Sequence, residues 1–327
     1  MNTIPVFIYH ETGQKKTFAC GFKQSYVKYC IKSAEDYNDL VILLGDQSNI
    51  HWCKKGVLAS EYENGKWARF KKVFVNLTSD YPDAWAQGFF KRFFLVEEYL
   101  KRNDYNECVI LDSDILTYIN YSELFDGLGI DVAHNTCPKD FSEDYNSSSA
   151  HVSYFTYKAI VEFTDYCIEQ YENHNRVLWD FYEETIKNKW AGGVTEMGLL
   201  YMWLKDHPEV KGLNLLMEKE GAVCDNTFFS NGRDYSGGYN GIRYAADPKY
   251  QMKKTIFKDG TPYFIKEDGS LVRAYVIHCG QITKMYMRDY YLHQKLGLMG
   301  KTRFWLEQMR AIASGIKRKI KSTDRNK

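Results

Sequence analysis

The sequence lacks the features that would mark it as a membrane-spanning, secreted or nucleic-acid-binding protein. No apolar run approaches the roughly 20 residues that cross a bilayer, and the first residues show no basic leader followed by an apolar stretch. The 43 Lys and Arg residues nearly balance the 42 Asp and Glu residues, and a net charge of +1 gives no bulk attraction to nucleic acid. The 8 cysteines form no CxxC pair, which predicts reduced, buried thiols. We therefore expect a cytoplasmic protein.

The composition otherwise fits one globular domain. Hydrophobic residues make up 44% of the 327 residues and charged residues 26%, which is ordinary for a folded domain. Aromatic residues, at 16%, are the one excess, and such rings build cores and also stack on sugars and bases. No internal repeat or clear linker divides the chain. We expect a single domain at 1–300 followed by a tail at 301–327.

Short apolar runs alternate with helical patterns through the first 135 residues. Near-continuous apolar runs are typical of strands that are covered on both faces, and they occur at 4–10, 39–46, 71–77 and 107–114. The segment 84–104 has apolar residues at three- and four-residue spacing and ends in basic residues, as an amphipathic helix does. This alternation predicts an α/β fold with a mostly parallel, doubly wound sheet.

Helices and hairpins are also expected in the second half of the chain. Residues 155–171 predict an amphipathic helix, and Thr195 predicts the N-cap of a helix that Pro208 ends. Three short strands follow, and they are joined by two strong hairpin signals, Asp259-Gly260 and Asp268-Gly269.

Two acids directly follow an apolar strand in the stretch "CVILDSDILTY". Asp112 and Asp114 are separated by one residue, so their carboxylates leave the strand on one face, or surround one centre if the chain turns at Ser113. Ligands gather at the carboxyl ends of strands in α/β sheets. Two carboxylates this close repel one another, so both stay ionised at low cost in free energy only when a cation lies between them. Oxygen ligands of this kind suit Mn²⁺ or Mg²⁺. The alternative is that Asp112 opens a turn and Asp114 caps a helix.

A second polar group follows the strand expected at 272–277. In "IHCGQITK", His278 and Lys284 come directly after the apolar residues. A neutral imidazole can complete an oxygen-rich Mn²⁺ site, and a lysine can neutralise a diphosphate. A lone histidine at a strand end is otherwise a structural hydrogen-bonding group. Together with the two acids, His278 favours the metal interpretation.

The order of these motifs resembles that of nucleotide-sugar-dependent glycosyltransferases of the GT-A fold. The nearest likeness is to the group that contains glycogenin and the bacterial lipopolysaccharide or capsule galactosyl- and glucosyltransferases. The matching marks are "VFIYH", "FFKRFF", "VILDSD" and "HCGQITK", and they span about residues 4 to 290. The resemblance implies a Rossmann-like, mixed and mostly parallel sheet flanked by helices. It also implies a nucleotide-binding half at 1–135 and an acceptor half at 136–300.

The resemblance further implies a reaction. A hexose would move from a nucleoside-diphosphate sugar, with UDP as the expected nucleotide, to a saccharide or lipid-linked saccharide in surface polysaccharide or glycolipid synthesis, with retention of configuration. Asp112, Asp114 and His278 would bind Mn²⁺ or Mg²⁺, and Asp112 would also face the donor. Lys284 would contact the diphosphate, and Arg92 would brace the donor-side network. No nucleic acid partner is expected.

The remaining roles that the resemblance implies concern the donor pocket. Tyr9 and His10 would line the nucleobase pocket, and His151 and Ser153 in "SSSAHVSYF" would contact the donor sugar. Glu196 in "GGVTEMGLL" would supply the carboxylate near the anomeric centre. The alternative for Glu196 is an acid in the first turn of a helix, where it complements the helix dipole.

The sequence also departs from the usual family pattern. In the late motif Gly280 comes one place early, and Met285-Tyr286 stand where Pro-Trp is usual. Glu196 stands in the acidic turn where Asp-Gln-Asp is usual. These departures indicate a divergent member, so donor specificity and stereochemistry do not transfer directly.

Two other interpretations of the acids stay open. "VILDSDILT" also resembles the first motif of haloacid-dehalogenase-type phosphatases, with Asp112 as nucleophile and Asp114 as acid and base. Those chains place the motif near the N-terminus and follow it with a second acidic pair, which is not evident here. A non-catalytic sugar-binding protein on the same fold is the other alternative.

The last residues form a basic, amphipathic pattern. Apolar residues follow a helical stripe through 305–320, and five Lys and Arg residues crowd positions 317–325. A helix of this kind can lie on an anionic bilayer, so peripheral contact with the inner face of the membrane is one expectation. A docked terminal helix with a frayed end is the alternative.

Overall fold

The computed structural model describes most of the chain. The described residues are 3–12, 26–78, 81–137, 147–173, 176–188, 193–228, 241–247 and 252–292. The expected tail at 301–327 lies outside them, so its contact with a membrane stays a prediction. Within the described stretches, no helix combines the length and the apolar character needed to cross a membrane.

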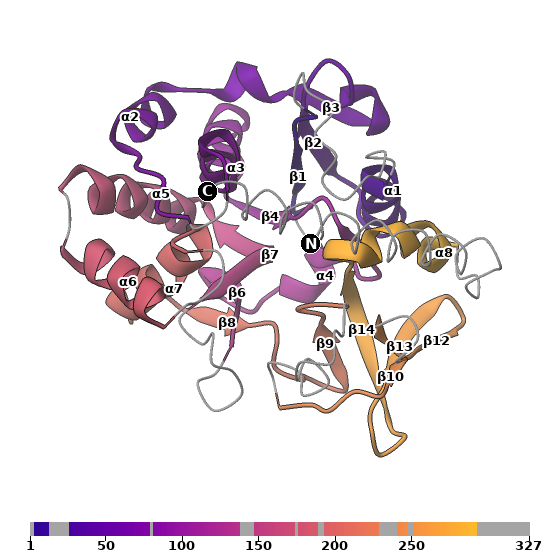
Figure 1. The fold of residues 1–327 in the computed structure, drawn as a ribbon. Helices are drawn as coiled ribbons and strands as arrows, with labels where there is room; N and C mark the ends of the chain where they lie inside the picture. The colour runs from indigo at the N-terminus through magenta and orange to yellow at the C-terminus, as the bar shows by residue number, and fades with distance from the viewer. Residues whose placement is uncertain are drawn as a thin grey trace, which may run out of the picture.

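A seven-stranded sheet forms the centre of the fold (Figure 1). Neighbouring strands are parallel, except that β7 (Ser148–Thr156) runs antiparallel to both of its neighbours. This is the mixed, mostly parallel sheet that the sequence predicts, so the expected fold class is confirmed. The strand order is β3 (Lys55–Leu58), β2 (Val41–Gly45), β1 (Val6–His10), β4 (Glu107–Leu111), β7 (Ser148–Thr156), β6 (Val132–Thr136) and β8 (Gly212–Asn214).

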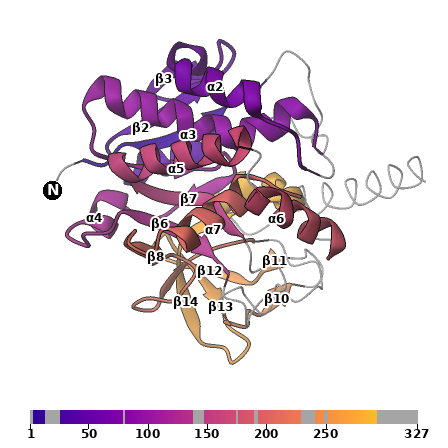
Figure 2. The same ribbon diagram turned by 90° about the vertical axis from the view of Figure 1, so that its left-hand side faces the viewer.

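Helices cover one face of this sheet. The core on that face is strongly aromatic; for example, the Phe93 ring lies 5.1 Å from Phe163 and 5.8 Å from Phe155. Figures 1 and 2 show these helices as a layer against the sheet. Their bounds are α2 (Gly65–Val73), α3 (Asp83–Asn103), α5 (Tyr157–Glu172), α6 (Arg176–Lys187) and α7 (Glu196–Asp206).

The opposite face carries a helix and a second, smaller sheet (Figure 1). Helix α1 (Val27–Tyr37) packs there against α8 (Met287–Tyr291). In the second sheet the order is β12 (Thr255–Lys258), β13 (Thr261–Ile265), β14 (Leu271–His278) and β5 (Ile115–Thr117), with β9 (Ala222–Cys224) parallel to β14. Smaller elements are η2 (Ile50–Trp52), η3 (Ala59–Tyr62), α4 (Tyr121–Phe125), β10 (Ala246–Asp247), β11 (Met252–Lys253) and η5 (Gln281–Tyr286).

Strand β5 carries the chain from the central sheet into the second sheet. Strand β5 follows β4 after only three residues, yet it belongs to the second sheet and pairs antiparallel with β14. In that pairing Ile115 lies opposite His278. The turn between β4 and β5 therefore meets the end of β14.

Several expected elements are confirmed and one is wrong. Helix α3 occupies the segment expected at 84–104, and the hairpin turns at Asp259 and Gly269 adopt positive φ angles of 48° and 82°. The strand expected at 71–77 is wrong, because Asn64 caps α2 through a hydrogen bond from the Trp67 amide and the helix runs to residue 73. Within that run Val73 ends α2 and Phe74 is its C-cap. The buried residues of the helix, Trp67 and Phe70, come before the run.

The described cysteines are free and buried. Seven of them fall within the described residues, and none forms a disulfide there. Burial raises the pKa of the Cys30 and Cys108 thiols, so they are unreactive. The expectation of reduced, buried thiols is confirmed for these seven.

Candidate active site

The two acids lie in the turn between β4 and β5. The Asp112 amide donates to the carbonyl of His151 (2.8 Å), and the Ile115 amide donates to the carbonyl of Asp112 (3.3 Å). The chain thus bends at the point where it passes from one sheet to the other. Asp114 is buried, whereas the Asp112 side chain is about one third exposed, at 31%. Both carboxylates therefore lie at the carboxyl end of a central strand, where ligands of α/β sheets bind.

His278 completes a three-residue cluster with these acids. Its Nε2 lies 3.5 Å from Asp114 Oδ1, and the Cys279 amide donates to the Asp114 carbonyl (2.9 Å). One ligand atom from each of Asp112, Asp114 and His278 lies within 4.8 Å of the other two. The structure therefore brings together the three residues predicted to bind a metal. A divalent cation fits this donor set of two carboxylates and one imidazole.

The second nitrogen of His278 is already occupied. Its Nδ1 lies 2.5 Å from the carbonyl of Asn226, and its backbone amide donates to Asp225 Oδ2 (3.0 Å). A carbonyl can only accept, so Nδ1 carries the proton and Nε2 is the atom that points at Asp114. This is the second contact that metal-binding histidines usually make. The ring is therefore oriented for binding through Nε2.

Cationic side chains balance the charge of the buried acid Asp114. The Lys284 ammonium lies 2.9 Å from Asp114 Oδ2. Burial by itself raises the pKa of Asp114, but Lys284 and His278 outweigh it and hold that pKa well below its usual range. Burial lowers the pKa of His278, but Asp114 and Asp112 together raise it to about 9. A bound divalent cation would take over this balancing role and displace the proton of His278.

Arg92 links the other acid to Glu196. It lies on α3, almost fully buried, and its guanidinium bonds to Asp112 and also, at 2.9 Å, to Glu196 Oε1. Glu196 begins α7, where Thr195 caps the helix by accepting from the Met197 amide. Burial raises the pKa of Glu196 to about 7 against the opposing charge of Arg92. Three predicted site residues thus form one continuous polar network.

The other predicted site residues lie around this cluster in different ways. The His151 ring stacks on His278 at 4.5 Å and 9°, and both His151 and Ser153 are fully buried on β7. Tyr9 bonds to Glu11 at the end of β1, and the His10 ring meets Tyr26 edge-on at 6.3 Å. These positions place all four near the carboxyl ends of β1, β4 and the neighbouring end of β7. Their predicted contacts with nucleobase and sugar stay predictions.

Sequence reasoning missed three residues that support this site. Asp225 and Asn226 hold His278, and the Tyr26 ring lies 5.1 Å from the Lys284 ammonium. Asp225 directly follows the buried strand β9, the same pattern of an apolar strand followed by an acid that drew attention to Asp112. No comparable signal marked Tyr26.

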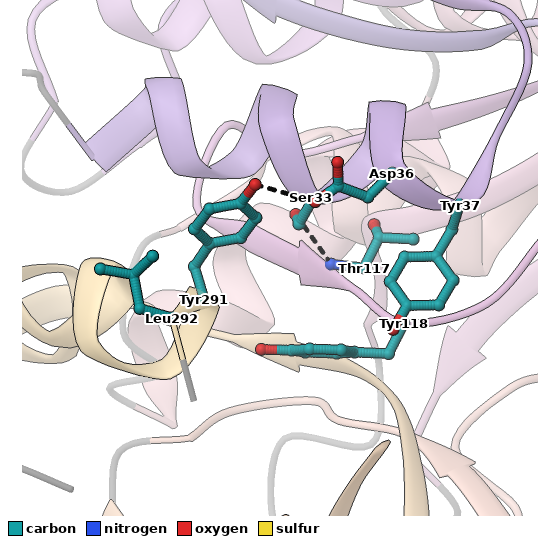
Figure 3. Close-up of a pocket in the computed structure, with 7 residues that line it drawn as sticks. All are labelled: Ser33, Asp36, Tyr37, Thr117, Tyr118, Tyr291 and Leu292. Atoms are coloured by element: carbon teal, nitrogen blue, oxygen red, sulfur yellow. Dashed lines mark hydrogen bonds between the residues drawn. The ribbon is translucent and has the colours of Figure 1, made fainter. Parts of the chain in front are cut away.

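A separate cavity of about 450 Å³ lies between α1 and α8 (Figure 3). Tyr291 donates to Asp36 there at 2.8 Å, and Ser33 accepts from the Thr117 amide at 3.1 Å. None of the predicted site residues lines it. The lining residues are Ser33, Asp36, Tyr37, Thr117, Tyr118, Tyr291 and Leu292.

Comparison with known proteins finds similar solved structures, and their sequence identity to this chain is low. No protein-family model matches the chain, and no curated protein matches it. Among solved structures, the galactosyltransferase LgtC, in complex with donor and acceptor sugar analogues, is 12% identical with a TM-score of 0.42, covering 93% of this chain and 95% of that chain. Mouse xyloside xylosyltransferase 1 is 11% identical with a TM-score of 0.40, covering 67% and 89%.

A third similar structure is a glycosyltransferase involved in glycosylation of the major capsid of PBCV-1. It is 10% identical with a TM-score of 0.38, covering 89% of this chain and 99% of that chain. All three of these structures are of glycosyltransferases. At these identities and TM-scores, the function of the chain is argued from its own site.

Proposed function

We propose that the protein is a metal-dependent glycosyltransferase. It transfers a hexose from a nucleoside-diphosphate sugar, with UDP as the nucleotide, to a saccharide or lipid-linked saccharide acceptor in surface polysaccharide or glycolipid synthesis. The observation that carries this proposal is the convergence of Asp112, Asp114 and His278, whose ligand atoms lie within 4.8 Å of one another beside Lys284. The resembling sequence motifs supply the reaction class and retention of configuration, and the free, buried cysteines favour a cytoplasmic location.

The metal site would be formed by Asp112, Asp114 and His278. Their oxygen and imidazole donors fit Mn²⁺ or Mg²⁺, and the Nδ1 contact with Asn226 leaves Nε2 facing the site. A bound divalent cation supplies Lewis-acid stabilisation of the diphosphate oxygens. The protein's own contribution is to hold the ligands at the turn where the two sheets meet.

Lys284 is the residue that would bind the departing diphosphate. It is half-buried and now pairs with Asp114. Once the acids have another cation to neutralise them, the ammonium is free to contact a phosphate oxygen. Negative charge develops on the diphosphate as the sugar bond breaks, and a fixed cation in a water-poor site stabilises that charge strongly. Burial lowers the pKa of Lys284, but Asp114 outweighs it and keeps the amine protonated.

Arg92 and Glu196 would complete the site from the helical face of the sheet. Arg92 orients Asp112 through their ion pair, and it holds Glu196 in place at 2.9 Å. In the proposed role Glu196 supplies a carboxylate near the anomeric carbon. Tyr9 and His10 would contact the nucleobase, and His151 and Ser153 the donor sugar.

Donor hydrolysis with and without Mn²⁺ tests this proposal. UDP-, GDP- and CMP-sugars are first compared by thermal shift with Mn²⁺ present, and we expect UDP-hexoses to stabilise the protein most. Metal-dependent release of nucleoside diphosphate, abolished in D114N, supports the transferase. Phosphate release from simple phosphate esters would indicate the phosphatase alternative. Sugar binding without any turnover would indicate the non-catalytic alternative.

A further inference from the structure

An exposed aromatic group lies at the start of α3. The exposed fraction is 43% for Trp85 and 37% for Tyr81. Their rings stack with centroids 6.3 Å apart and an interplanar angle of 25°, and Phe89 meets Tyr81 edge-on at 5.2 Å. We call Tyr81, Trp85 and Phe89 the aromatic platform. Large rings bury much apolar surface and are usually covered, so an exposed stacked pair needs an explanation.

The platform continues a helix stripe that is buried further along α3. Trp85, Phe89, Arg92 and Phe93 recur at three- and four-residue spacing, so they share one side of the helix. Phe93 is 1% exposed and Arg92 7%. The helix leads into β4 and runs opposite to it, and Arg92 already meets Asp112 just beyond the end of β4. The helical turns of α3 that precede Arg92 therefore extend past the carboxyl end of the sheet, so the sheet does not cover Trp85.

Helix geometry places the platform close to the candidate active site. At 1.5 Å rise per residue, Trp85 lies about 10 Å along the axis from Arg92, the residue that bonds to both Asp112 and Glu196. A second connection runs through the preceding segment, where the Leu77 carbonyl accepts from the Val194 amide (3.0 Å). Val194 comes two residues before Glu196. The platform is thus fixed to the site through both α3 and the start of α7.

Polar groups border the platform. The Asn76 amide nitrogen donates to the carbonyl of Tyr81 (2.8 Å) and to Asp83 Oδ1 (2.9 Å), and the Thr78 hydroxyl bonds to Asn76 Oδ1 (2.5 Å). Asp83 is exposed, and Gly88 leaves open space on the helix surface. An aromatic face bordered by amide, hydroxyl and carboxylate groups matches the apolar faces and hydroxyl edges of a sugar ring.

We propose that Tyr81 and Trp85 bind a sugar residue of the acceptor, distal to the residue that receives the hexose. This inference rests on the proposed function and assigns the acceptor as an oligosaccharide rather than a single sugar. The carboxylate of Asp83 repels anions, so the platform fits a neutral saccharide better than a nucleotide or an anionic lipid headgroup. The separation from Arg92 leaves room for the reacting sugar between the platform and the site.

The test compares W85A and Y81A with wild type, using methyl glycosides of galactose and glucose and the matched methyl disaccharides as acceptors. We expect wild type to prefer disaccharides. Loss of one ring should raise the KM for disaccharides about five- to tenfold and leave the KM for monosaccharides unchanged. Donor hydrolysis without acceptor should stay at the wild-type rate in both variants. W85F should retain most of the disaccharide preference, because it keeps an aromatic face.

Saturation-transfer NMR with the same glycosides gives a readout that needs no turnover. The disaccharide signals should weaken in W85A and persist in L128A, which removes a similarly exposed apolar side chain after α4, with unchanged melting temperatures in both. Equal disaccharide signals in W85A and wild type, or no saccharide signal in wild type, would contradict sugar binding by the platform. Loss of binding to phosphatidylglycerol vesicles in W85A, with disaccharide binding intact, would assign it to a membrane instead. Absence of donor hydrolysis in wild type would refute the proposed function. The NMR result would still test whether the platform binds a saccharide.

Discussion

The imidazole Nε2 of His278 lies 3.5 Å from Asp114 Oδ1, although the two residues come from opposite halves of the chain. The pairing of β14 with β5 creates this contact, because it sets Ile115 opposite His278. Side chains at the ends of β4 and β14, which belong to different sheets, are thereby held close together.

Replacing His278 should abolish tight metal binding. H278A removes the nitrogen ligand and leaves two carboxylates, so the affinity for Mn²⁺ should fall at least tenfold. Electron paramagnetic resonance of free Mn²⁺ measures this directly. The control is H207A, since His207 is 40% exposed in its side chain and pairs with Glu209 after α7. Equal Mn²⁺ affinity in H278A and H207A would contradict the predicted metal site.

Lys284 should affect catalysis and metal binding in opposite directions. In K284M the competing ammonium beside Asp114 is gone, so Mn²⁺ should bind as tightly as in wild type or more tightly. Donor hydrolysis should nevertheless fall about 10²- to 10³-fold, because a fixed charge on the leaving group is lost. Titration calorimetry and initial rates separate the two effects. K266M, which removes a lysine that directly follows β13 and pairs with the exposed Glu218, should change neither.

The pH dependence of stability should carry a contribution from Glu196. Its pKa is about 7 in the folded protein, above the ordinary value of 4.5. Between these values the folded state binds more protons than the unfolded state, so stability falls as the pH rises. The decrease should amount to as much as about 3 kcal/mol. Urea unfolding at pH 5 and pH 8 should show this decrease in wild type and a smaller one in E196Q. An identical decrease in E196Q would show that Glu196 titrates normally.

The pair of Lys253 and Asp225 should be important for stability beneath His278. Lys253 Nζ lies 2.6 Å from Asp225 Oδ1, and both side chains are almost completely buried. Removing one partner leaves an uncompensated charge, so K253M should lower the free energy of unfolding by about 3–5 kcal/mol. The double variant K253M/D225N should recover part of that loss. Urea titration is the measurement, and an additive loss in the double variant would exclude direct coupling of the pair.

Residues 305–327 are expected to contact the membrane. Their basic residues should each contribute roughly 1 kcal/mol near an anionic surface. Deletion of 305–327 should therefore reduce co-sedimentation with vesicles that contain phosphatidylglycerol, and high salt should reduce that of the full chain. A truncated protein that pellets as the full chain does would leave the docked-helix alternative.

Motifs in the sequence predicted much of the sheet and the metal-ligand candidates. The apolar runs of β1, β2 and β4 are long enough to indicate buried strands, and the acids after β4 mark the edge where ligands bind. The run at 71–77 misled because its first residues end α2, and Phe74, the C-cap, packs on Phe90 in the aromatic core. Short apolar runs give the same signal for both elements.

Tertiary contacts, which local patterns do not encode, decided the rest. The sequence alone determined the chemistry of the ends of β4 and β14, because an acid or an imidazole after an apolar strand is a local feature. Only the fold decided that β5 leaves the main sheet to pair with β14, that Asn226 fixes the tautomer of His278, and that Trp85 is left exposed. These relations depend on contacts between residues far apart in the chain, where the burial of each side chain is set by what packs against it.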